Sequence, residues 1–295
     1  MPELPEVETV RRGLIPALGG RRITQVIQRR PDLRFPLPDD FARRLTGRTV
    51  LHIDRRGKYL LFTLDDGNVW IAHLGMSGRF VIDGDAPADR RPATAGALDG
   101  TTAAGDAHDH IVFSTDDGAV IRFRDPRRFG FMDLGAAATL DSHPMLSILG
   151  CDPLGDTFTP AWLTARLTRR RAPIKAALLD QAVIAGMGNI YASESLFQAR
   201  VSPECPADSV VARGAERLIT AIRAVFTAAI AAGGSSLRDH RQPSGELGFF
   251  QHQFAVYGRA GKACPGCRCD LAETGGVRRI VQSGRATFYC ARRQR

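Results

Sequence analysis

The chain opens with MPELPEVETVRRGLIPAL over residues 1–18, and this stretch decides how the N-terminal part folds. Val7, Val10 and Leu14 recur at helical spacing. Such spacing predicts a helix over residues 3–18 with one apolar face. The apolar face of this helix must pack against another part of the chain, which we expect the sequence that follows to form.

The first residues of this stretch also permit covalent chemistry. Once Met1 is removed, Pro2 becomes an N-terminal secondary amine, and an α-amino group has a pKa of about 7.7–8.0. The uncharged amine can attack an electrophilic carbon and form a Schiff base, whose cationic imine withdraws electrons. Glu3 and Glu6 are close enough to move protons. A proline and acidic residues are also common in the first turn of a helix without any catalytic role. The rest of the chain must therefore decide between a structural and a catalytic role for these residues.

A β-rich region follows the predicted helix. The pairs Asp66-Gly67 and Asp117-Gly118 each lie between alternating apolar segments, which indicates β-hairpins. We expect strands at residues 50–55, 59–65, 68–74, 79–83, 110–115 and 119–124. Short strands of this kind predict a sandwich or barrel against which the N-terminal helix packs. Residues 84–107 are rich in Gly, Ala, Asp and Pro without a period, and we expect a long inserted loop there.

The second half of the chain is predicted to be helical, after a linker at residues 134–160. Its clearest helix spans 210–232, has one apolar face and ends at Gly233-Gly234.

The segment Gly186-Met187-Gly188-Asn189 joins two apolar helical segments, 174–184 and 190–199. Glycines before a helix leave backbone N–H groups open to phosphate. Asn189 can cap the helix or donate to a phosphate oxygen. A plain corner between two helices explains the same glycines.

A cysteine cluster lies near the C-terminus. Its members are Cys264, Cys267, Cys269 and Cys290. A Cys-x2-Cys knuckle paired with a later knuckle binds tetrahedral zinc. The second knuckle is incomplete, because Arg293 stands where a fourth thiolate is expected. Cys269 is the candidate for the fourth ligand, and a finger that folds without metal is the alternative. Residues 277–282 and 285–289 would form a hairpin with Arg285 at its tip.

Four further side chains permit either a structural or a functional interpretation. Lys58 opens a predicted strand, either as a solvated charge or as a group that binds phosphate or transfers a proton. Met76 lies in one tight turn, and Arg127 and Phe129 lie in a second. Alone, Met76 and Phe129 would be core residues. Beside Arg127 they could form a wedge that separates base steps and fills the space of an extruded base.

Composition narrows the class of protein. The 295 residues suggest two domains, and a net charge of +9 with a pI near 9.8 suits a polyanion, nucleic acid first. We find no apolar run long enough for a membrane span and no signal peptide. Cys151 and Cys205 stand alone as ordinary thiols, and cysteine usage favours the cytoplasm.

In this order, the motifs resemble those of bacterial formamidopyrimidine-DNA glycosylase. The matching segments are PELPEVETVRRGL, RRGKYLL, HLGMSG, HDH, DPRRFG, GMGNIYASESLF, YGR and GRATFYC. The resemblance covers nearly the whole chain and fails at the 84–107 insertion and the cysteine pattern. It implies an α+β fold in three parts: an N-terminal β-sandwich with a helix (1–135), a helical helix-two-turn-helix (H2TH) domain (136–254) and a zinc-finger-type hairpin (255–295).

The resemblance implies base-excision repair: removal of 8-oxoguanine and formamidopyrimidines from damaged double-stranded DNA, then strand cleavage at the abasic site by β,δ-elimination. Pro2 would attack C1′, Glu3 would be the acid/base, and Glu6 would orient the site. Lys58 would contact phosphate and donate a proton in β-elimination, and Arg285 would serve δ-elimination.

The implied DNA contacts are Met76, His108, Arg127, Phe129, Arg170, Lys175, Asn189 and Tyr257. Arg170 stands where the family often has lysine, so a forked donor replaces a point charge. Any zinc would be structural, held by Cys264, Cys267 and Cys290 with Cys269. The protein would be a monomer in the bacterial cytosol or nucleoid, with no membrane partner.

Two alternatives remain open. A sister glycosylase for oxidised pyrimidines, endonuclease VIII-like, shares the N-terminal proline, but Leu4 and the Met76, Arg127 and Phe129 trio favour the purine enzyme. A non-catalytic damage-binding protein would explain the incomplete cysteine finger. It would leave the joint presence of Pro2 and the implied catalytic residues unexplained.

Overall fold

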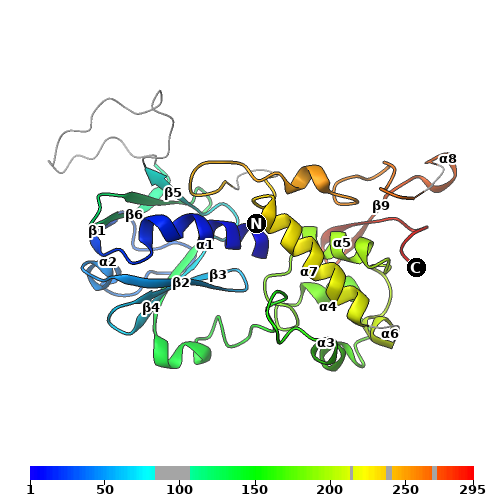
Figure 1. Cartoon of the computed structure of the whole chain (residues 1–295), viewed down its shortest axis with the longest axis horizontal. Coiled ribbons are helices and arrows are strands. Elements are labelled where there is room, and N and C mark those ends of the chain that lie inside the picture. Colours follow the sequence, from blue (N-terminus) through cyan, green and yellow to red (C-terminus); the bar gives the residue numbers. More distant parts are fainter. Residues whose placement is uncertain (84–106, 213–214, 237–240, 268–270) are drawn as a thin grey trace. The chain divides into compact units, whose positions relative to one another are not determined.

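The computed structural model describes residues 1–83, 107–212, 215–236, 241–267 and 271–295, which form two compact units (Figure 1). The N-terminal unit comprises Met1–Pro2, Glu6–His143 and Ser235–Gly248. The helical unit comprises Glu3–Pro5, Pro144–Gly234 and Phe249–Arg295. The three-part division at 135/136 and 254/255 stays a prediction. Contacts group the C-terminal hairpin with the helices, and Ser235–Gly248 with the sandwich.

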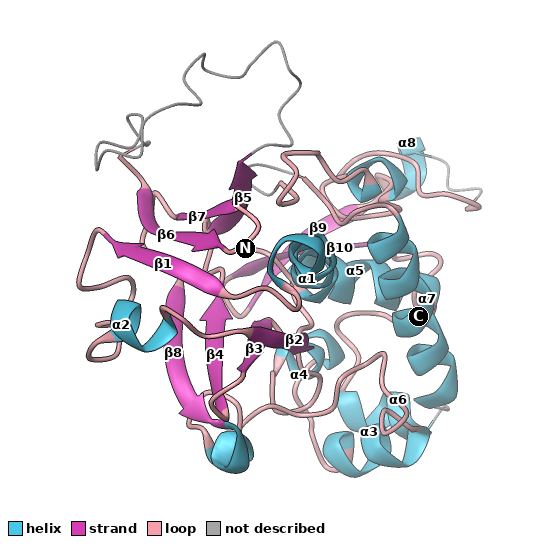
Figure 2. Ribbon diagram, turned by 60° about the vertical axis from the view of Figure 1, so that its left-hand side comes forward, coloured by secondary structure: helices cyan, strands magenta, loops and turns pink. Residues whose placement is uncertain are grey.

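The N-terminal unit is an antiparallel β-sandwich (Figure 2). One sheet has the order β1-β6-β7-β5 and the other β2-β3-β4-β8. Their bounds are β1 Ile23–Gln28, β2 Val50–Arg56, β3 Tyr59–Leu64, β4 Asn68–His73, β5 Arg79–Asp83, β6 Asp109–Thr115, β7 Val120–Arg124 and β8 Phe131–Ala136. Aromatic rings fill the core: Phe62 stacks on Trp70 at 4.0 Å between centroids, and Phe113 lies 4.6 Å from Trp70. The predicted sandwich is confirmed, and so are the six predicted strands.

Helix α1 (Leu4–Leu18) confirms the helix expected at residues 3–18, and Val7, Val10 and Leu14 on its apolar face are buried. The short helices α2 (Phe41–Leu45) and η2 (Ala137–Ser142) complete this unit.

Two strands escaped the sequence analysis. β1 alternates weakly, with only Ile23 fully buried, and β8 runs into residues taken for the linker. Neither has a regular alternation of buried and exposed residues: β1 buries one residue, and the last four residues of β8 are partly or fully exposed. The linker predicted from residue 134 is therefore wrong at its start, because β8 continues to Ala136 and η2 follows it.

The helical unit contains α3 Pro160–Leu167, α4 Ile174–Leu179, α5 Asn189–Gln198, α6 Ala207–Ala212, α7 Ala215–Ala231, η3 Phe250–Gln253, α8 Leu271–Thr274, β9 Arg278–Gln282 and β10 Arg285–Tyr289. The predicted helix at 210–232 corresponds to α6 and α7, and residues 213–214 between them lie outside the described part of the chain. Its predicted end is confirmed: Gly233 and Gly234 have positive φ, and Gly234 N–H donates to the Ala229 carbonyl at 2.8 Å.

The helix predicted over 174–184 is too long. α4 ends at Leu179 because the Asp180 carboxylate accepts the Ala182 N–H at 3.0 Å and closes a turn. The C-terminal hairpin is confirmed as β9 and β10, and Ser283-Gly284, both with positive φ, form its two-residue turn.

No helix of the described residues has the length and apolar character that crossing a membrane requires.

Candidate active site and nucleic-acid interface

Glu3 caps helix α5 from the far end of the chain. Its buried carboxylate accepts the Ile190 N–H at 3.0 Å and the Tyr191 N–H at 3.4 Å. The α5 N-cap is Gly188, which brings no side chain of its own. The helix terminus, with its free N–H groups and positive dipole, favours an ionised carboxylate. A potential acid/base group is therefore held directly after Pro2 in the chain.

The glycines of the 186–189 segment make room for this contact. A Cβ on Gly188 would lie 2.1 Å from the Glu3 carboxyl carbon. A Cβ on Gly186, which has positive φ, would lie 2.7 Å from that of Leu4. The Leu4 N–H also donates to the Gly186 carbonyl at 3.0 Å. The sequence left two explanations of these glycines open, phosphate binding or a plain corner between helices. In the structure they make room for residues 3 and 4.

A buried lysine joins α4, α5 and the hairpin. Lys175 Nζ donates to Asn189 Oδ1 at 2.6 Å, Thr287 Oγ1 at 2.7 Å and the Ala286 carbonyl at 3.0 Å. Asn189 donates to the same carbonyl at 2.9 Å, so its side chain does not cap α5. Burial lowers the pKa of Lys175 to about 8; the charge of Glu3 opposes this shift and that of Arg285 adds to it.

This cluster brings predicted site residues together. Arg285 is exposed at the start of β10, next to the carbonyl that Lys175 and Asn189 share. Lys175 was expected to contact DNA, but its ammonium is buried and bonded within the protein. A direct phosphate contact by Lys175 would require it to exchange one of these bonds.

Pro2, Glu6 and Lys58 belong to the N-terminal unit. Glu6 is buried, and its Oε1 accepts the N–H and hydroxyl of Ser235 at 2.8 and 2.9 Å. Lys58 is buried in the two-residue turn between β2 and β3, directly before the first residue of β3, and Gly57 beside it has positive φ.

Sequence reasoning missed His73, on β4. Its Nδ1 accepts the Gly75 N–H at 3.0 Å, and its ring lies 4.8 Å from that of Tyr59. Burial lowers the pKa of His73 to about 4, and the charges of Lys58 and Arg34 act in the same direction. His73 is therefore neutral at physiological pH and accepts a hydrogen bond from the turn that carries Met76. The motif HLGMSG contains it, which is the signal that could have found it.

Met76, Arg127 and Phe129 lie on two turns of the N-terminal unit. Met76 is 39% and Phe129 42% exposed, which is unusual for large apolar side chains. The Arg127 guanidinium carbon lies 4.9 Å from the centre of the Phe129 ring. His108 is exposed beside β6, and its carbonyl accepts the Asp125 N–H at 3.1 Å. Met76 and Phe129 are therefore not core residues, which was the alternative that the sequence left open.

The remaining predicted contacts lie on the helical unit. Arg170 is partly exposed and pairs with Asp180 at 2.8 Å. Tyr257 packs its ring edge-on against Phe288, and its N–H donates to Glu194 at 2.8 Å. Glu194, a second residue that sequence reasoning missed, is buried on α5 and also accepts the N–H groups of residues 255 and 256.

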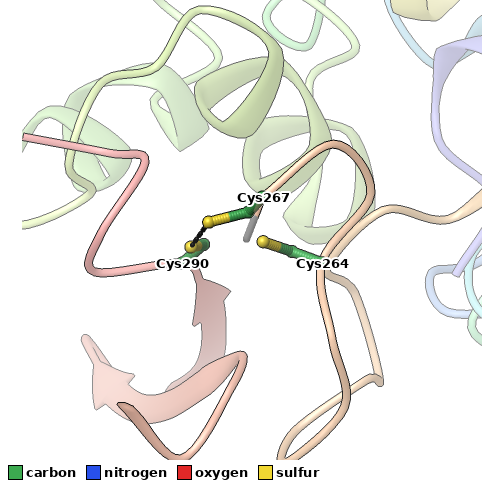
Figure 3. Close-up of side chains that lie close together, drawn as sticks. All are labelled: Cys264, Cys267 and Cys290. Atoms are coloured by element: carbon green, nitrogen blue, oxygen red, sulfur yellow. Dashed lines mark hydrogen bonds between the residues drawn. The ribbon is translucent and has the colours of Figure 1, made fainter. Parts of the chain in front are cut away.

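Three cysteines converge at the base of the hairpin (Figure 3). The sulfurs of Cys264, Cys267 and Cys290 all lie within 4.8 Å of one another, and those of Cys267 and Cys290 are 3.8 Å apart. Two thiolates about 2.3 Å from a tetrahedral zinc ion are themselves ~3.8 Å apart, which is the separation of Cys267 and Cys290, and Cys264 lies close enough to act as a third ligand. The predicted fourth ligand, Cys269, lies outside the described residues, and so do residues 84–106 of the insertion predicted at 84–107.

Arg293, at the position of the missing cysteine, contacts the knuckle between Cys264 and Cys267. Its Nη1 donates to the Pro265 carbonyl at 3.0 Å, and its guanidinium lies 4.9 Å from the Phe197 ring centre. A Cβ on Gly266 would lie 2.9 Å from Arg293 Nη1. Arg293 therefore closes the knuckle by packing and hydrogen bonding, and offers no metal ligand.

Comparison with known proteins accounts for this arrangement. Residues 1–132 match the model of the formamidopyrimidine-DNA glycosylase N-terminal domain, and residues 149–241 match that of the formamidopyrimidine-DNA glycosylase H2TH domain. The formamidopyrimidine-DNA glycosylase of Rhodospirillum rubrum is 57% identical over 295 residues, covering 100% of both chains.

Two solved structures are similar along their whole length. The MutM (Fpg) protein of Thermus thermophilus is 38% identical with a TM-score of 0.80, covering 99% of this chain and 98% of that one. A mutant Fpg of Lactococcus lactis, solved in complex with a Fapy-dG containing DNA, is 30% identical with a TM-score of 0.83, covering 100% of both chains. On these matches of sequence and fold, the chain belongs to the formamidopyrimidine-DNA glycosylase family.

Proposed function

We propose that this protein excises oxidised purines, 8-oxoguanine and formamidopyrimidines, from double-stranded DNA and then cleaves the strand at the abasic site. The observation that carries the proposal is the Glu3 carboxylate, held on the first N–H groups of α5 directly after Pro2. A fixed acid/base group beside an N-terminal secondary amine suits Schiff-base chemistry.

Excision begins once Met1 has been removed. The Pro2 nitrogen attacks C1′ of the flipped nucleotide, the bond from C1′ to the base breaks, and the base leaves with a proton. Glu3 assists the opening of the sugar by proton transfer. Glu6, bonded to Ser235, keeps the start of α1 in place. The product is a cationic imine between Pro2 and C1′.

Strand cleavage follows from the imine. Its positive charge acidifies the protons on C2′, so one is lost, and the C3′–oxygen bond then breaks in β-elimination. Lys58 is proposed to donate the proton to the leaving phosphate, and Arg285 to hold the phosphates and serve the δ-elimination that breaks the C5′–oxygen bond. Hydrolysis of the imine releases Pro2. These steps need no metal ion.

Recognition combines charge with distortion of the duplex. A net charge of +9 favours phosphate binding, with His108, Arg170, Asn189 and Tyr257 as proposed contacts. Lys175 is proposed to assist DNA binding by fixing the positions of Asn189 and the hairpin through its hydrogen bonds. Met76, Arg127 and Phe129, called the wedge below, would enter the duplex and occupy the space that the extruded base leaves.

Zinc is proposed as a structural ion held by Cys264, Cys267 and Cys290, with Cys269 as the fourth ligand. It would fix the base of the hairpin that carries Arg285. We further propose that the protein acts as a monomer on damaged DNA in the bacterial cytosol.

Borohydride trapping tests the function. A duplex with 8-oxoguanine opposite cytosine is incubated with the protein and borohydride, and peptide mapping locates the adduct. We expect an adduct at Pro2 in the wild type and none in Pro2→Gly, while a duplex with thymine glycol is cleaved more slowly. Tight binding without an adduct would favour a non-catalytic damage-binding protein, and preference for thymine glycol would favour the pyrimidine enzyme.

A further inference from the structure

We infer that Asp125 is a positioning residue that holds the wedge in its working shape, and that Ser77 transmits its effect to Met76 and Arg127. This inference rests on the proposed function, because it concerns the side chains that would fill the space of the extruded base.

Asp125 is fully buried and uses all of its polar groups. Its Oδ1 accepts the Ser77 hydroxyl and its Oδ2 accepts the Gly130 N–H, both at 2.6 Å. Its N–H donates to the His108 carbonyl at 3.1 Å, and its own carbonyl accepts His110 Nε2–H at 2.8 Å. A side chain with no exposed surface cannot touch DNA, so any effect of Asp125 on DNA must pass through its neighbours.

Those neighbours are the residues beside the wedge. Ser77 directly follows Met76, and its Oγ also accepts the Arg127 N–H at 3.1 Å. Gly130 directly follows Phe129. The Asp125 carboxylate therefore bonds directly to the residues that follow Met76 and Phe129, and it reaches the Arg127 N–H through the Ser77 hydroxyl.

The two turns also touch through their backbones. A Cβ on Gly75, which has positive φ, would lie 2.2 Å from the carbonyl carbon and oxygen of Phe129. A Cβ on Gly130 would lie 2.8 Å from Asp125 Oδ2. At this separation neither turn can shift without the other, so the bonds to Asp125 fix the two turns as one body.

The wedge needs such support because its apolar side chains are only partly packed. Met76 and Phe129 are both more than one-third exposed, so burial does not hold them. A loose wedge would lose conformational freedom when it enters the duplex, and that loss would oppose unstacking. A wedge that Asp125 already holds in place loses less conformational entropy when it enters the duplex.

Ser77→Ala in the full-length protein tests the inference. The duplex carries 8-oxoguanine opposite cytosine with 2-aminopurine beside the lesion, whose fluorescence rises when the bases unstack. We expect the rates of unstacking and single-turnover excision to fall about ten-fold or more, as for loss of one hydrogen bond to a charged group. Cleavage of a preformed abasic site should fall less, because no base has to be unpaired.

Thr115→Ala is the matched control. Thr115 Oγ1 donates to Asp117 Oδ1 at 2.6 Å, so the same kind of bond is lost at the opposite end of the β6–β7 hairpin. We expect wild-type unstacking and excision from this variant. Asp125→Asn is the second test variant, and the melting temperatures of all three variants are measured.

The outcomes separate the inference from the proposed function. Wild-type unstacking by folded Ser77→Ala would overturn the inference, and so would equal losses in excision and abasic-site cleavage. If Asp125→Asn does not fold, Ser77→Ala alone decides. If the wild type leaves the lesion uncut, the proposed function fails, whereas the fluorescence comparison still decides the role of Asp125.

Discussion

At the residue scale, the site depends on close contacts that leave no space for an extra atom. Gly188 is the clearest case, because its missing side chain is what lets the Glu3 carboxylate reach α5. Motif resemblance named Glu3 and the glycines but could not pair them, because the two segments are far apart in the sequence and nothing in it shows which groups meet. The partners of His73, Glu194 and Asp125 were missed for the same reason, because the groups that each side chain contacts are defined only in the folded chain.

Gly188→Ala is expected to abolish most excision. The added Cβ would lie 2.1 Å from the Glu3 carboxyl carbon, so Glu3 must leave its position. Misplacing a reacting group by about 1 Å can cost 100-fold in rate. Single-turnover excision of 8-oxoguanine measures the effect. Gly155→Ala is the control, because its Cβ would meet nothing closer than 3.5 Å. Activity within a few-fold of wild type in Gly188→Ala would refute the role of this contact.

The protonation of His73 makes stability depend on pH. Its folded pKa of about 4 lies below the ordinary 6.5, so the unfolded chain binds a proton first as the pH falls. The stabilising contribution is therefore complete above pH 6.5 and is lost between pH 6.5 and 4, about 3 kcal/mol in all. Denaturant unfolding at a series of pH values should show this decline in the wild type and a flatter profile in His73→Gln. Identical profiles for the two proteins would contradict the assignment.

At the element scale, apolar patterning identified the elements that are buried on a continuous face. Helices α1 and α7 and six strands follow that rule. Strands β1 and β8 did not, because few of their residues are buried and those that are do not alternate. The end of α4 is set by one carboxylate turn that apolar spacing does not register. The hairpin β9–β10 was predicted from its two short segments, whereas its attachment to Lys175 on α4 was not.

The cysteine cluster gives a prediction for the hairpin as an element. Cys264→Ser should lower zinc to well below one ion per chain and weaken DNA binding, because the hairpin that carries Arg285 loses its anchor. Borohydride trapping at saturating DNA should persist. Metal analysis and DNA titration measure both effects, and Cys205→Ser, outside the cluster, is the control.

The fourth ligand is decided by Cys269→Ser in the same assay. We expect metal loss equal to that of Cys264→Ser. One zinc ion per chain in Cys269→Ser would exclude Cys269 from the site, and the three clustered sulfurs would then need a ligand from elsewhere.

At the scale of the whole molecule, the residues proposed for catalysis and DNA binding are divided between the two units. The N-terminal unit carries the wedge, Lys58 and His108, and the helical unit carries Glu3, Arg285 and the cysteine cluster. Pro2 and Glu3 are adjacent in the chain yet belong to different units. Composition predicted a polyanion partner for the whole, but the assignment of side chains to units could not be predicted, because the N-terminal segment contributes to both.

The net charge of +9 leads to a prediction about the whole DNA-binding surface. Each phosphate contact adds about 0.9 to the slope of log affinity against log salt for duplex DNA. Arg170→Gln should therefore lower that slope by about one and weaken binding to damaged and undamaged duplexes alike. Arg43→Gln removes the same charge from an exposed side chain on α2 and controls for net charge. If the two variants shift the slope equally, affinity reflects overall charge and Arg170 makes no phosphate contact. If only Arg170→Gln shifts it, a localised phosphate site lies on the helical unit.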